Sequence, residues 1–582
     1  RFVSATPSPV NALPSRQPRR WEIAPRAPKE HFEAFPDLHP LIVQLLCNRG
    51  LNHPDQVAEF LSPAASSADP FRLKGMGDAV MRLRRAVLGR EPIAVYGDYD
   101  VDGVTATVLL THTLRSLGAD VTAYIPDRFE EGYGLNTGAL DKLAAQGVRL
   151  VVTVDCGARA MTEIAHGNQI GLEVIVTDHH EPEGDALPPA LAVINPRQSG
   201  CPYPDKDLAG VGLAFRLAQA LAWELARDDR LPSSPVGELL DLVALGTVAD
   251  LAPLLGENRS MVQRGLALIN ARARPGIAAL SDVSSLKPGE IDAAAIGFSL
   301  GPRLNAAGRV EHARAAYELL ASDSVERAAQ FAYQLNEQNR ERQRLTAEVV
   351  EQATARALAA DPDAPLLFAG STEFSSGVVG LAASRLVEVH HRPAIVMSFG
   401  DGAARGSARS IPQFHITHAL DECRDLLTKH GGHAAAAGFT VLLDRLDELQ
   451  ARLTAIAARK RAEGDWAPIL KADALVRLST LTPALYETLA QLEPHGIGNP
   501  KPVFVSRNIR VQHKRALKEG AHLKLALLDE NGRSWDAIAF RMGDRIAHIP
   551  DRVDLAYTFE VNVWNGERRW QLNVKDLQSA QV

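Results

Sequence analysis

Three carboxylates alternate in the segment 98–103, which reads DYDVDG and directly follows the apolar run 93–97. Asp98, Asp100 and Asp102 repel one another at neutral pH unless a cation neutralises their charge. A carboxylate in such a place can also act as a nucleophile. The residue types and their spacing therefore predict either a cation site or a carboxylate nucleophile at the end of a strand.

Two narrower interpretations of this segment conflict with its surroundings. An EF-hand loop opens with D-x-D-x-D-G, but it needs a preceding helix and a glutamate at position 12, where this chain has Leu109. A phosphatase that forms an aspartyl-phosphate matches residues 100–104 as D-x-D-x-V, but the apolar run ends at Gly97 rather than immediately before Asp100. Neither interpretation explains the acidic and histidine residues that follow.

A two-metal hydrolase needs further ligands at other strand ends, and the sequence provides them. Asp155 ends one apolar run, and the triplet Asp178, His179 and His180 ends the next. Ligands bind beyond the carboxyl ends of the strands in an open parallel sheet, so these side chains can converge. A single aspartate there is more often a helix cap, but clusters at three equivalent strand ends favour a metal site.

Asp250, which follows the apolar stretch 239–249, adds a further carboxylate. A mixture of aspartate and histidine ligands suits Mn²⁺ or Mg²⁺, and the imidazole favours Mn²⁺. Two such ions about 3.5–4 Å apart could activate water and stabilise both oxygens of an in-line phosphoryl displacement. We therefore expect two ions per site.

Short apolar runs that alternate with helical patterns must position these residues. This alternation favours an α/β fold with a parallel sheet and right-handed crossovers. The predicted strands cover residues 93–97, 121–126, 150–155, 173–178 and 191–195. The predicted helices cover residues 105–117, 138–145 and 159–168, with two short helices in 40–62 and mostly helix in 208–272.

A long amphipathic pattern in residues 323–360 predicts a helix that joins two domains. A second, smaller α/β pattern follows it. Its predicted strands cover residues 366–369 and 394–398, and its predicted helices cover 378–389, 414–429 and 442–463. Five short strand-like runs in residues 501–582 favour a small β-barrel, with the OB-fold as the first candidate.

Composition excludes several classes of protein. The chain has 582 residues, of which 46% are apolar and 23% charged, as in soluble globular proteins. No apolar run approaches the ~18 residues of a membrane helix, and four scattered cysteines fit a reducing cytosol rather than a disulfide framework. Residues 501–582 hold 14 Lys and Arg against 10 Asp and Glu, whereas the whole chain has a net charge of −7. This asymmetry is compatible with a nucleic-acid-facing end or with ordinary variation of surface charge.

Together these motifs resemble those of the DHH phosphoesterase superfamily and, within it, the RecJ family of single-strand-specific 5′→3′ exonucleases. The segments that resemble motifs I to IV are GDYDVDG (97–103), VDCG (154–157), TDHH (177–180) and GTVADLAPL (246–254). GPRLNAAGR (301–309) resembles a further RecJ motif, SARS (407–410) and GGHAAAAGF (431–439) resemble the DHHA1 domain, and LEPHGIGNPKPVF (492–504) resembles the lead-in to the OB-fold. The resemblance extends from about residue 40 to the end.

The resemblance implies roles for individual residues. The implied metal ligands are Asp98, Asp100, Asp102, Asp155, His179 and Asp250, and all of these but Asp98, together with His180, are the implied catalytic residues. Asp155 would bridge two ions, and His180 would face the scissile phosphate or orient a ligand. Many superfamily members have a histidine where this chain has Tyr96, so Asp98 is expected to replace it. Residues 374–380 lack the histidine of the related W-H-P-G-V-I-G pattern.

A single nucleic-acid strand needs phosphate clamps and stacking platforms. Arg405, Ser407 and Arg409 would share one face of a strand, and Arg128 could hold a 5′-terminal phosphate. Any one of these arginines could instead be a solvated or ion-paired surface residue. The predicted substrate-binding residues are Arg128, Arg303, Asn305, Arg309, Arg405, Ser407, Arg409, Gly432 and His433. In the barrel we add Arg507, Arg510, Lys514, Arg515, Lys518 and Lys524, with Phe504 and Trp535 either as stacking platforms or as core residues.

We predict six segments along the chain. They are a disordered or irregular segment (1–38), a DHH domain with N-terminal helices (39–322), a connecting helix (323–360), a DHHA1 domain (361–465), a helical linker (466–500) and an OB-fold domain (501–582). The resemblance implies a metal-dependent exonuclease that degrades single-stranded DNA from the 5′ end to mononucleotides in DNA repair and recombination. It also implies a helicase and a single-strand-binding protein as partners, a monomer, no membrane, and a cytoplasmic location on the bacterial nucleoid. Two alternatives are a hydrolase of short oligoribonucleotides or cyclic dinucleotides and a DNA-binding protein without activity.

Overall fold

The computed structural model describes residues 19–62, 68–128, 131–132, 134–226, 236–310, 313–564 and 567–580. The chain forms two compact units. Residues 53–342 and 491–500 make up one, here called the central unit, and residues 1–52, 343–490 and 501–582 make up the other, here called the flanking unit. Within the described ranges, no helix combines the length and the apolar character that crossing a membrane requires.

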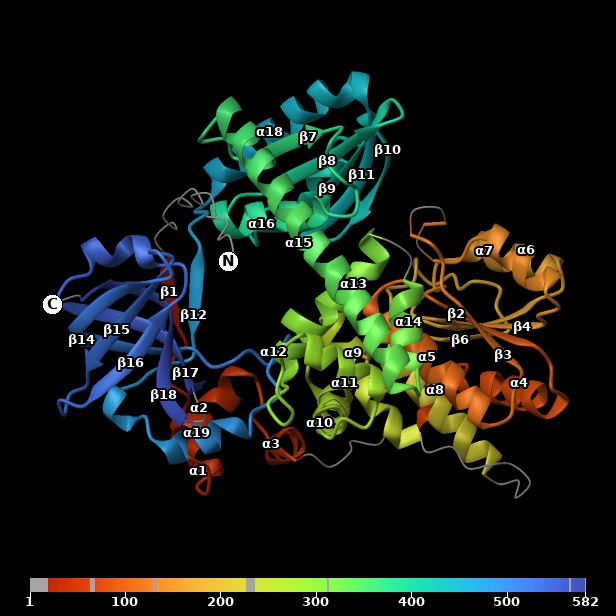
Figure 1. Cartoon of the computed structure of the whole chain (residues 1–582), viewed down its shortest axis with the longest axis horizontal. Coiled ribbons are helices and arrows are strands. Elements are labelled where there is room, and N and C mark those ends of the chain that lie inside the picture. The colour runs from red at the N-terminus through yellow and green to blue at the C-terminus, as the bar shows by residue number, and fades with distance from the viewer. Residues whose placement is uncertain are drawn as a thin grey trace, which may run out of the picture. The chain divides into compact units, whose positions relative to one another are not determined.

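Five parallel strands form the sheet of the central unit, in the order β3-β2-β4-β5-β6 (Figure 1). They are β2 (Ile93–Gly97), β3 (Val121–Tyr124), β4 (Leu150–Val154), β5 (Glu173–Thr177) and β6 (Ala192–Ile194). All residues of β2 and β4 are buried, as in parallel sheets that are covered on both faces. β3 and β4 lie on opposite sides of β2, so the connection after β2 and the connection after β4 lead to opposite sides of the sheet. The loops after β2 and β4 therefore part at a topological switch point, where α/β proteins bind ligands.

Helices cover both faces of this sheet (Figure 1). They are α4 (Met76–Gly89), α5 (Val101–Ser116) and α8 (Gly210–Leu225) on one face, and α6 (Thr137–Ala145) and α7 (Met161–Gln169) on the other. Alternate residues of β2 enter the two cores: Val95 packs in the core with α5, whereas Tyr96 packs in the core with α6. The predicted strands and helices of this α/β region are confirmed to within a few residues, except that α5 begins four residues earlier than predicted.

The rest of the central unit is helical, which confirms the prediction for residues 208–272, whereas no helices were predicted for residues 275–321. Its elements are α3 (Pro54–Leu61), η1 (Pro70–Arg72), η2 (Val236–Leu239), α9 (Leu240–Ala249), α10 (Gly256–Asn270), α11 (Pro275–Val283), α12 (Ala293–Ala295), the π-turn η3 (Ile296–Leu300), α13 (Gly301–Val310) and α14 (Arg314–Ala321). The elements α12, η3 and α13 follow one another without a break, so residues 293–310 form one helix with a π-turn inside it. The predicted long helix is α15 (Val325–Ala360), which runs through the boundary between the two units.

The segment 491–500 belongs to the central unit although the flanking unit holds the residues on both sides of it. The Arg259 side chain, which is 2% exposed, holds this segment. Its guanidinium donates hydrogen bonds to the carbonyl oxygens of Phe60, Gln491, Leu492, Glu493 and Pro494 at 2.8–3.3 Å. The Leu254 N–H also donates to the Ile497 carbonyl at 2.8 Å, which joins the segment to the loop after Asp250.

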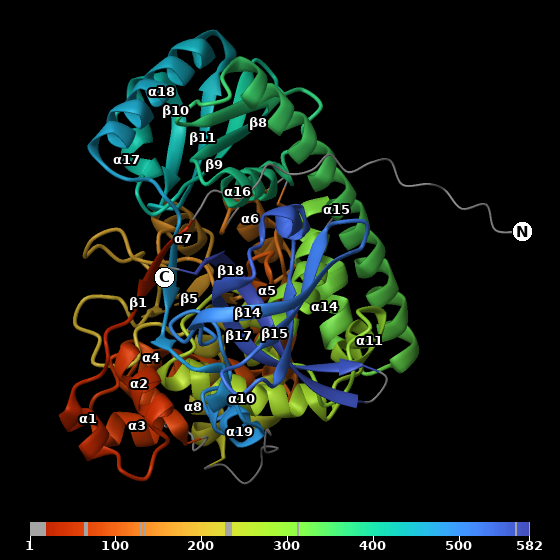
Figure 2. The same ribbon diagram turned by 90° about the vertical axis from the view of Figure 1, so that its left-hand side faces the viewer.

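The flanking unit contains a mixed sheet in the order β10-β11-β9-β8-β7 (Figure 1 and Figure 2). The strands are β7 (Leu367–Ser371), β8 (Ala394–Gly400), β9 (Ala403–Arg409), β10 (Leu427–Gly432) and β11 (Ala436–Leu442). The helices are α16 (Val379–His390), α17 (Ile416–Asp421) and α18 (Leu446–Glu463), with the turns η4 (Arg424–Leu426) and η5 (Leu443–Arg445). The core on one face is formed with α17 and α18, and the core on the other with α16 and the end of α15.

The predicted helix 414–429 is wrong beyond residue 421. Residues 427–432 form an edge strand that pairs antiparallel with β11, for example Gly431 with Gly438. The side chains of this stretch alternate little between apolar and polar, because it lies at the edge of the sheet. A strand of this kind is defined by its partner rather than by its own periodicity.

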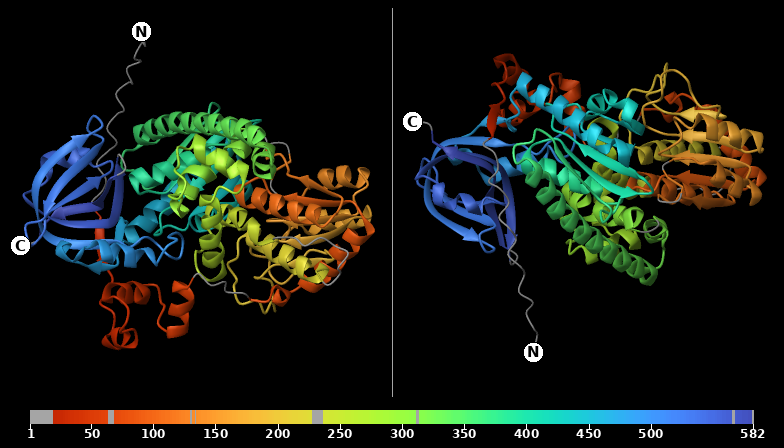
Figure 3. Two further views of the ribbon diagram at one scale, coloured as in Figure 1. Left: turned by 60° about the horizontal axis from the view of Figure 1, so that its bottom comes forward. Right: turned by 90° about the horizontal axis from the view of Figure 1, so that it is seen from above.

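The C-terminal residues form a closed barrel, as predicted (Figure 3). Its strands are β14 (Phe504–Leu517), β15 (His522–Leu528), β16 (Ser534–Ala539), β17 (Arg552–Trp564) and β18 (Glu567–Ser579), with the turn η7 (Gly543–His548). Neighbouring strands pair in the order β14-β15-β16-β18-β17, and an additional pairing of β14 with β17 closes the barrel.

The N-terminal segment is more regular than predicted in its described part. β1 (Arg20–Ile23) pairs in parallel with β12 (Ile469–Ala472), and Trp21 Nε1 donates to Asp576 Oδ2 at 2.8 Å. The helices α1 (Lys29–Ala34) and α2 (Pro40–Asn48) follow. The irregular segment that we predicted for 1–38 is therefore wrong for residues 19–38, and residues 1–18 lie outside the described ranges. The predicted helical linker 466–500 contains α19 (Pro483–Ala490) and η6 (Leu478–Thr480), but also β12 and β13 (Ala474–Leu475).

Candidate metal centre and substrate-binding surface

The loop after β2 presents two carboxylates at the carboxyl edge of the central unit's sheet. Asp98 follows β2 directly and is 2% exposed. Asp100 is the N-cap residue of α5, and its Oδ1 accepts a hydrogen bond from the Gly103 N–H at 3.0 Å. This cap satisfies one backbone donor of the helix. The cap therefore fixes the side chain of Asp100 at the start of α5.

The start of α8 fixes two further carboxylates. The oxygens of Asp102 accept hydrogen bonds from the N–H groups of Gly210 and Val211 at 2.7 and 2.9 Å, where the helix N-terminus stabilises negative charge. Asp155 lies beside the same turn in a left-handed backbone conformation, with φ at 61°. A Cβ on Gly210 would lie 2.6 Å from Asp155 Cβ and Oδ1, so only glycine permits this approach. Backbone outliers of this kind occur preferentially at functional sites.

His179 and Asp250 complete the cluster. His179 Nε2 lies 3.2 Å from Asp155 Oδ1, 3.8 Å from Asp250 Oδ2 and 4.0 Å from Asp102 Oδ2. Three overlapping sets of ligand atoms lie within 4.8 Å of one another: Asp98, Asp100 and Asp155; Asp102, His179 and Asp250; and Asp155, His179 and His180. The structure thus brings all six predicted ligands and His180 together.

Buried ligand atoms without hydrogen bonds show that this site fits a cation. Asp98 Oδ1, Asp155 Oδ1 and His179 Nε2 are buried and have no hydrogen-bond partner among the described residues. Burying a carboxylate oxygen in this way is costly unless a positive charge faces it. Carboxylate oxygens with one imidazole form a donor set suited to Mn²⁺ or Mg²⁺.

The pKa shifts at this site have the same origin. Burial, and then repulsion by Asp100, raise the pKa of Asp98 to about 8 and that of Asp250 to about 7. Burial and the neighbouring His180 lower the pKa of His179 to about 4, which keeps its imidazole neutral. A neutral imidazole is the form that binds metal ions.

Asp178 has a role that the sequence analysis did not assign. Its Oδ1 lies 2.8 Å from His180 Nδ1, and its Oδ2 accepts a hydrogen bond from the Ala158 N–H at 2.7 Å. Burial lowers the pKa of His180, but the hydrogen bond and the charge of Asp178 outweigh burial and raise it to about 9. Asn195 Nδ2 also donates to the His180 carbonyl, at 2.8 Å. The aspartate of the D-H-H triplet was the available signal, because a carboxylate commonly orients a functional histidine.

Tyr96, which replaces the histidine of many relatives, lies away from the cluster. Its hydroxyl donates to the Gly134 carbonyl at 3.0 Å and accepts from Asn136 Nδ2 at 3.2 Å. Its ring stacks on Tyr124 with 5.1 Å between the centroids. The side chain therefore stabilises the face of the sheet that α6 covers.

Arginines lie near the metal cluster on the side of Tyr99. The Arg128 guanidinium lies 5.1 Å from the centre of the Tyr99 ring. Burial raises the pKa of Tyr99, and the charges of Arg128 and Arg309 oppose this rise. Asn305 has a structural contact: its Oδ1 accepts a hydrogen bond from the Val101 N–H at 3.2 Å, at the start of α5. Arg303 donates to Asn336 Oδ1 at 3.0 Å and to the Ser299 carbonyl at 2.8 Å.

In the flanking unit, β9 places Arg405, Ser407 and Arg409 on one face, as alternation requires. Arg409 Nη1 donates to Ser407 Oγ at 3.0 Å. A Cβ on Gly380 would lie 2.9 Å from Ser407 Oγ and 3.0 Å from Arg409 Nη2, so the start of α16 lies against these side chains. A helix N-terminus beside guanidinium groups favours an anion such as phosphate. Gly432 and His433 are exposed at the turn between β10 and β11.

The two barrel aromatics are core residues rather than stacking platforms. Phe504 is 1% exposed and Trp535 is 3% exposed. The alternative that we left open for these rings, burial in a small barrel, is therefore the correct one. The basic residues Arg507, Arg510, Lys514, Arg515 and Lys518 are exposed on or beside β14, and Lys524 is half-buried next to Asp536.

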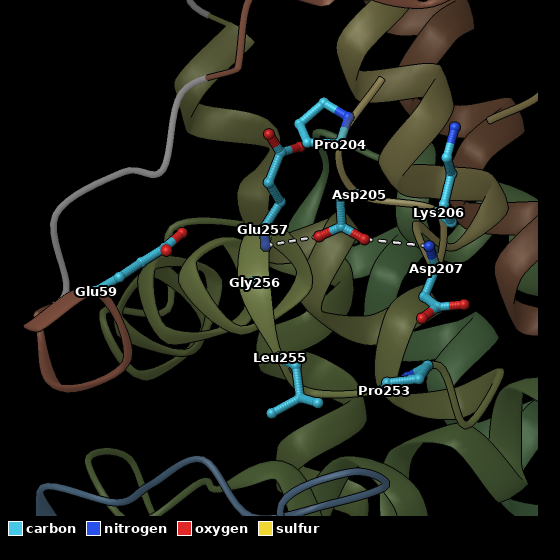
Figure 4. A pocket seen from close by; sticks show the side chains of 9 residues that line it. All are labelled: Glu59, Pro204, Asp205, Lys206, Asp207, Pro253, Leu255, Gly256 and Glu257. Carbon is cyan, nitrogen blue, oxygen red and sulfur yellow. Dashed lines mark hydrogen bonds between the residues drawn. The ribbon is translucent and has the colours of Figure 1, made fainter. Parts of the chain in front are cut away.

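A pocket of about 380 Å³ lies beside the loop that follows Asp250. Figure 4 shows that the Asp205 carboxylate lies between the backbone N–H groups of Glu257 and Asp207, at 2.9 and 3.1 Å. Asp205 thus caps the start of α10, while Pro253 and Leu255 form the opposite wall of the pocket. The pocket belongs to the support of the Asp250 loop.

Three protein families match the chain: the DHH family N-terminal domain over residues 92–247, the DHHA1 domain over 363–459 and the RecJ OB domain over 472–576. The single-stranded-DNA-specific exonuclease RecJ of Bacillus subtilis is 38% identical over 566 residues, which are 96% of this chain and 70% of that protein. The crystal structure of RecJ from Thermus thermophilus with Mn²⁺ matches 97% of this chain and 80% of that one, with 31% identity and a TM-score of 0.83. The Mg²⁺ complex of the same protein matches with 30% identity and a TM-score of 0.77, covering 97% of this chain and 79% of that one.

Proposed function

Because the chain belongs to the RecJ family of metal-dependent exonucleases specific for single-stranded DNA, we propose that it degrades single-stranded DNA from the 5′ end to 5′-mononucleotides. The observation that supports this most is that the ligand atoms of Asp98, Asp100, Asp155, His179 and their neighbours lie close together, and that three of these atoms are buried without a hydrogen-bond partner among the described residues. The alternatives of a dinucleotide hydrolase and of a binding protein without activity fit less well. The first does not need a barrel, and the second does not need a complete ligand set.

We propose that two Mn²⁺ or Mg²⁺ ions bind here, held by Asp98, Asp100, Asp102, Asp155, His179 and Asp250. When bound, these ions supply a nucleophilic water and neutralise charge on the scissile phosphate. The chain's own residues then position the reaction. The α5 cap and the α8 N-terminus hold Asp100 and Asp102, and the packing of Gly210 holds Asp155. Since their geometry is set before substrate binds, no reorganisation is needed during the reaction.

His180 is the proposed proton-bearing group. The carboxylate of Asp178 lies 2.8 Å from its Nδ1 and orients the ring, and the hydrogen bond and charge of Asp178 raise the pKa of His180 in the metal-free protein. A cationic imidazole also carries a proton at Nε2. We propose that this N–H donates a hydrogen bond to a non-bridging oxygen of the scissile phosphate and stabilises the charge that develops there.

We propose that several groups of basic and polar residues bind the phosphates of the DNA strand. Arg128 would bind the 5′-terminal phosphate, and Arg303 and Arg309 would bind phosphates further along, with Asn305 supporting the start of α5. In the flanking unit Ser407 and Arg409 would bind a phosphate near the start of α16, and Arg405, Gly432 and His433 would bind other phosphates of the strand. The exposed basic residues of the barrel would bind the strand further from its end.

We extend these proposals to the domains and to the cell. Residues 39–322 would hydrolyse the strand, and residues 361–465 and 501–582 would hold it. This division follows the three family matches. The enzyme would act as a monomer in DNA repair and recombination, on the bacterial nucleoid in the cytoplasm, with a helicase and a single-strand-binding protein as partners.

The deciding experiment uses oligonucleotides labelled at the 5′ or at the 3′ end, in Mn²⁺ or in EDTA, with a blunt duplex alongside. We expect early release of the 5′-labelled mononucleotide in Mn²⁺ and no degradation of the duplex. The matched inactive control is Asp155→Asn, which removes the charge but keeps the shape, since asparagine also tolerates φ near 61°. Early release of the 3′-labelled mononucleotide would show that the enzyme degrades the strand from its 3′ end instead. Binding without cleavage would favour the alternative of a DNA-binding protein without activity. Cleavage of dinucleotides alone would favour the alternative of a dinucleotide hydrolase.

A further inference from the structure

The helix 293–310 contacts both loops that carry the metal ligands. Midway along it, a Cβ on Gly301 would lie 3.5 Å from Ala249 Cβ, in the last turn before Asp250. Near its end, a Cβ on Gly308 would lie 3.1 Å from the carbonyl oxygen of Tyr99, within the loop between Asp98 and Asp100. The helix therefore follows the edge of the metal cluster from one ligand loop to the other.

One aromatic side chain projects from this helix without cover. Phe298 lies in the π-turn η3 and is 86% exposed, more than any other large apolar side chain in the described part of the chain. Its neighbours Ile296 and Leu300 are completely buried and anchor the turn in the core. The turn therefore holds Phe298 outward on a rigid base. Turns of this kind are frequently found at functional sites.

The position of Phe298 relates it to the predicted phosphate-binding groups. Phe298, Pro302, Asn305 and Arg309 recur at intervals of four, three and four residues, which places them along one side of the helix. Asn305 contacts the start of α5, and the charge of Arg309 acts on Tyr99. The Tyr99 ring itself faces the Arg128 guanidinium at 5.1 Å. Phe298 is far more exposed than Tyr99, which is half-buried.

We propose that Phe298 is a base-stacking residue that holds one nucleobase of the single strand while the neighbouring arginines hold its phosphates. The inference rests on the proposed function and extends it to the recognition of bases. A phenyl ring offers a flat face and no hydrogen-bonding atom, so it stacks on every base and selects none. Bases within a duplex are stacked on one another and paired, so this contact also favours unpaired substrates.

The test is equilibrium binding of a fluorescent single-stranded oligonucleotide in EDTA, where cleavage does not occur. Phe298→Ala should weaken affinity by about 5-fold to about 100-fold, the usual effect of removing one stacking aromatic. Phe298→Trp should restore affinity because it restores the flat surface. The matched control is Trp223→Ala, which removes a 49% exposed aromatic from the far end of α8 and should leave affinity unchanged.

Abasic nucleotides separate stacking from a structural effect. With an abasic site moved along the strand from its 5′ end, wild type and Phe298→Ala should bind equally at the one position that faces Phe298. The inference is overturned if Phe298→Ala binds the intact strand as wild type does, or if its loss is the same at every abasic position. If the wild-type protein itself neither binds nor degrades the strand, the proposed function fails, which is a different result. Thermal unfolding of Phe298→Ala should match that of wild type.

Discussion

Replacing Gly210 by alanine should disable the metal centre without removing any ligand. A Cβ at this position would lie 2.6 Å from Asp155 Cβ and Oδ1, whereas ordinary contacts begin at 3.4 Å. Either Asp155 or the start of α8 must therefore move by about 1 Å. The same turn of α8 donates both hydrogen bonds to Asp102, so a shift of the turn displaces two ligands at once.

A displacement of this size at a reacting centre costs about 100-fold in rate. We expect kcat/KM on single-stranded DNA to fall by about that factor for Gly210→Ala, and the Mn²⁺ concentration for half-maximal activity to rise. The fold should survive, because overpacking costs about 1–3 kcal/mol while alanine regains up to about 1 kcal/mol of helix propensity. The assay is a Mn²⁺ titration of mononucleotide release, with thermal unfolding measured on the same samples.

Gly212→Ala is the matched control, two residues further along the same helix. A Cβ there would meet Met261 and Leu208 at 3.5 and 3.6 Å, which are ordinary contacts. This variant should keep wild-type activity and Mn²⁺ dependence. The reasoning is refuted if Gly210→Ala is as active as wild type at every Mn²⁺ concentration, or if both variants lose activity equally.

Three further predictions concern other parts of the chain. Arg259→Met should lower the unfolding temperature by several degrees, because it leaves buried carbonyls without donors; Arg264→Met, at an exposed site on the same helix, should not. His390 is 6% exposed, and burial followed by the charge of Arg392 lowers its pKa. The unfolded chain therefore takes up the proton first as pH falls below about 6.5, which destabilises the folded protein. His390→Gln should reduce the loss of thermal stability between pH 7 and pH 5, and an unchanged loss would contradict this. Arg510→Ala, at an exposed site on β14, should reduce the slope of log affinity for single strands against log salt by about 0.7, and an unchanged slope would show that this arginine binds no phosphate.

Much of the central unit could be predicted because its signals are local. The strands are continuous apolar runs, and in a parallel sheet their carboxyl ends share one edge, so the positions of Asp98, Asp155 and His179 in the sequence predicted that they would meet. The order of the strands could not be predicted in this way, although it creates the switch point. The strain at Asp155 and the approach of Gly210 also depend on how α8 packs, which no sequence window contains.

The elements and residue roles that the sequence did not predict depend on contacts with residues far away in the chain. β1 exists because it pairs with residues 469–472, more than 400 positions away, so its own four residues carry little strand signal. β10 is likewise defined by β11. The burial of Phe504 and Trp535 depends on closure of the barrel, and the contact of Asn305 with Val101 depends on tertiary packing. From the sequence alone, Phe504, Trp535 and Asn305 could all be interpreted as residues that contact the substrate.

The placement of residues 491–500 in the central unit has a consequence for synthesis on the ribosome. The first part of that unit ends at residue 342, so Arg259 waits for its carbonyl partners until roughly 150 more residues have been translated. At about 5–20 residues per second this interval lasts roughly 8 to 30 s. During it the wall formed by Leu254 and Leu255 lacks the glycine-rich segment that later packs on it. The nascent protein therefore lacks part of the support of the loop after Asp250 until residues 491–500 have been made, so the metal site is completed only shortly before the barrel, residues 501–582, is synthesised.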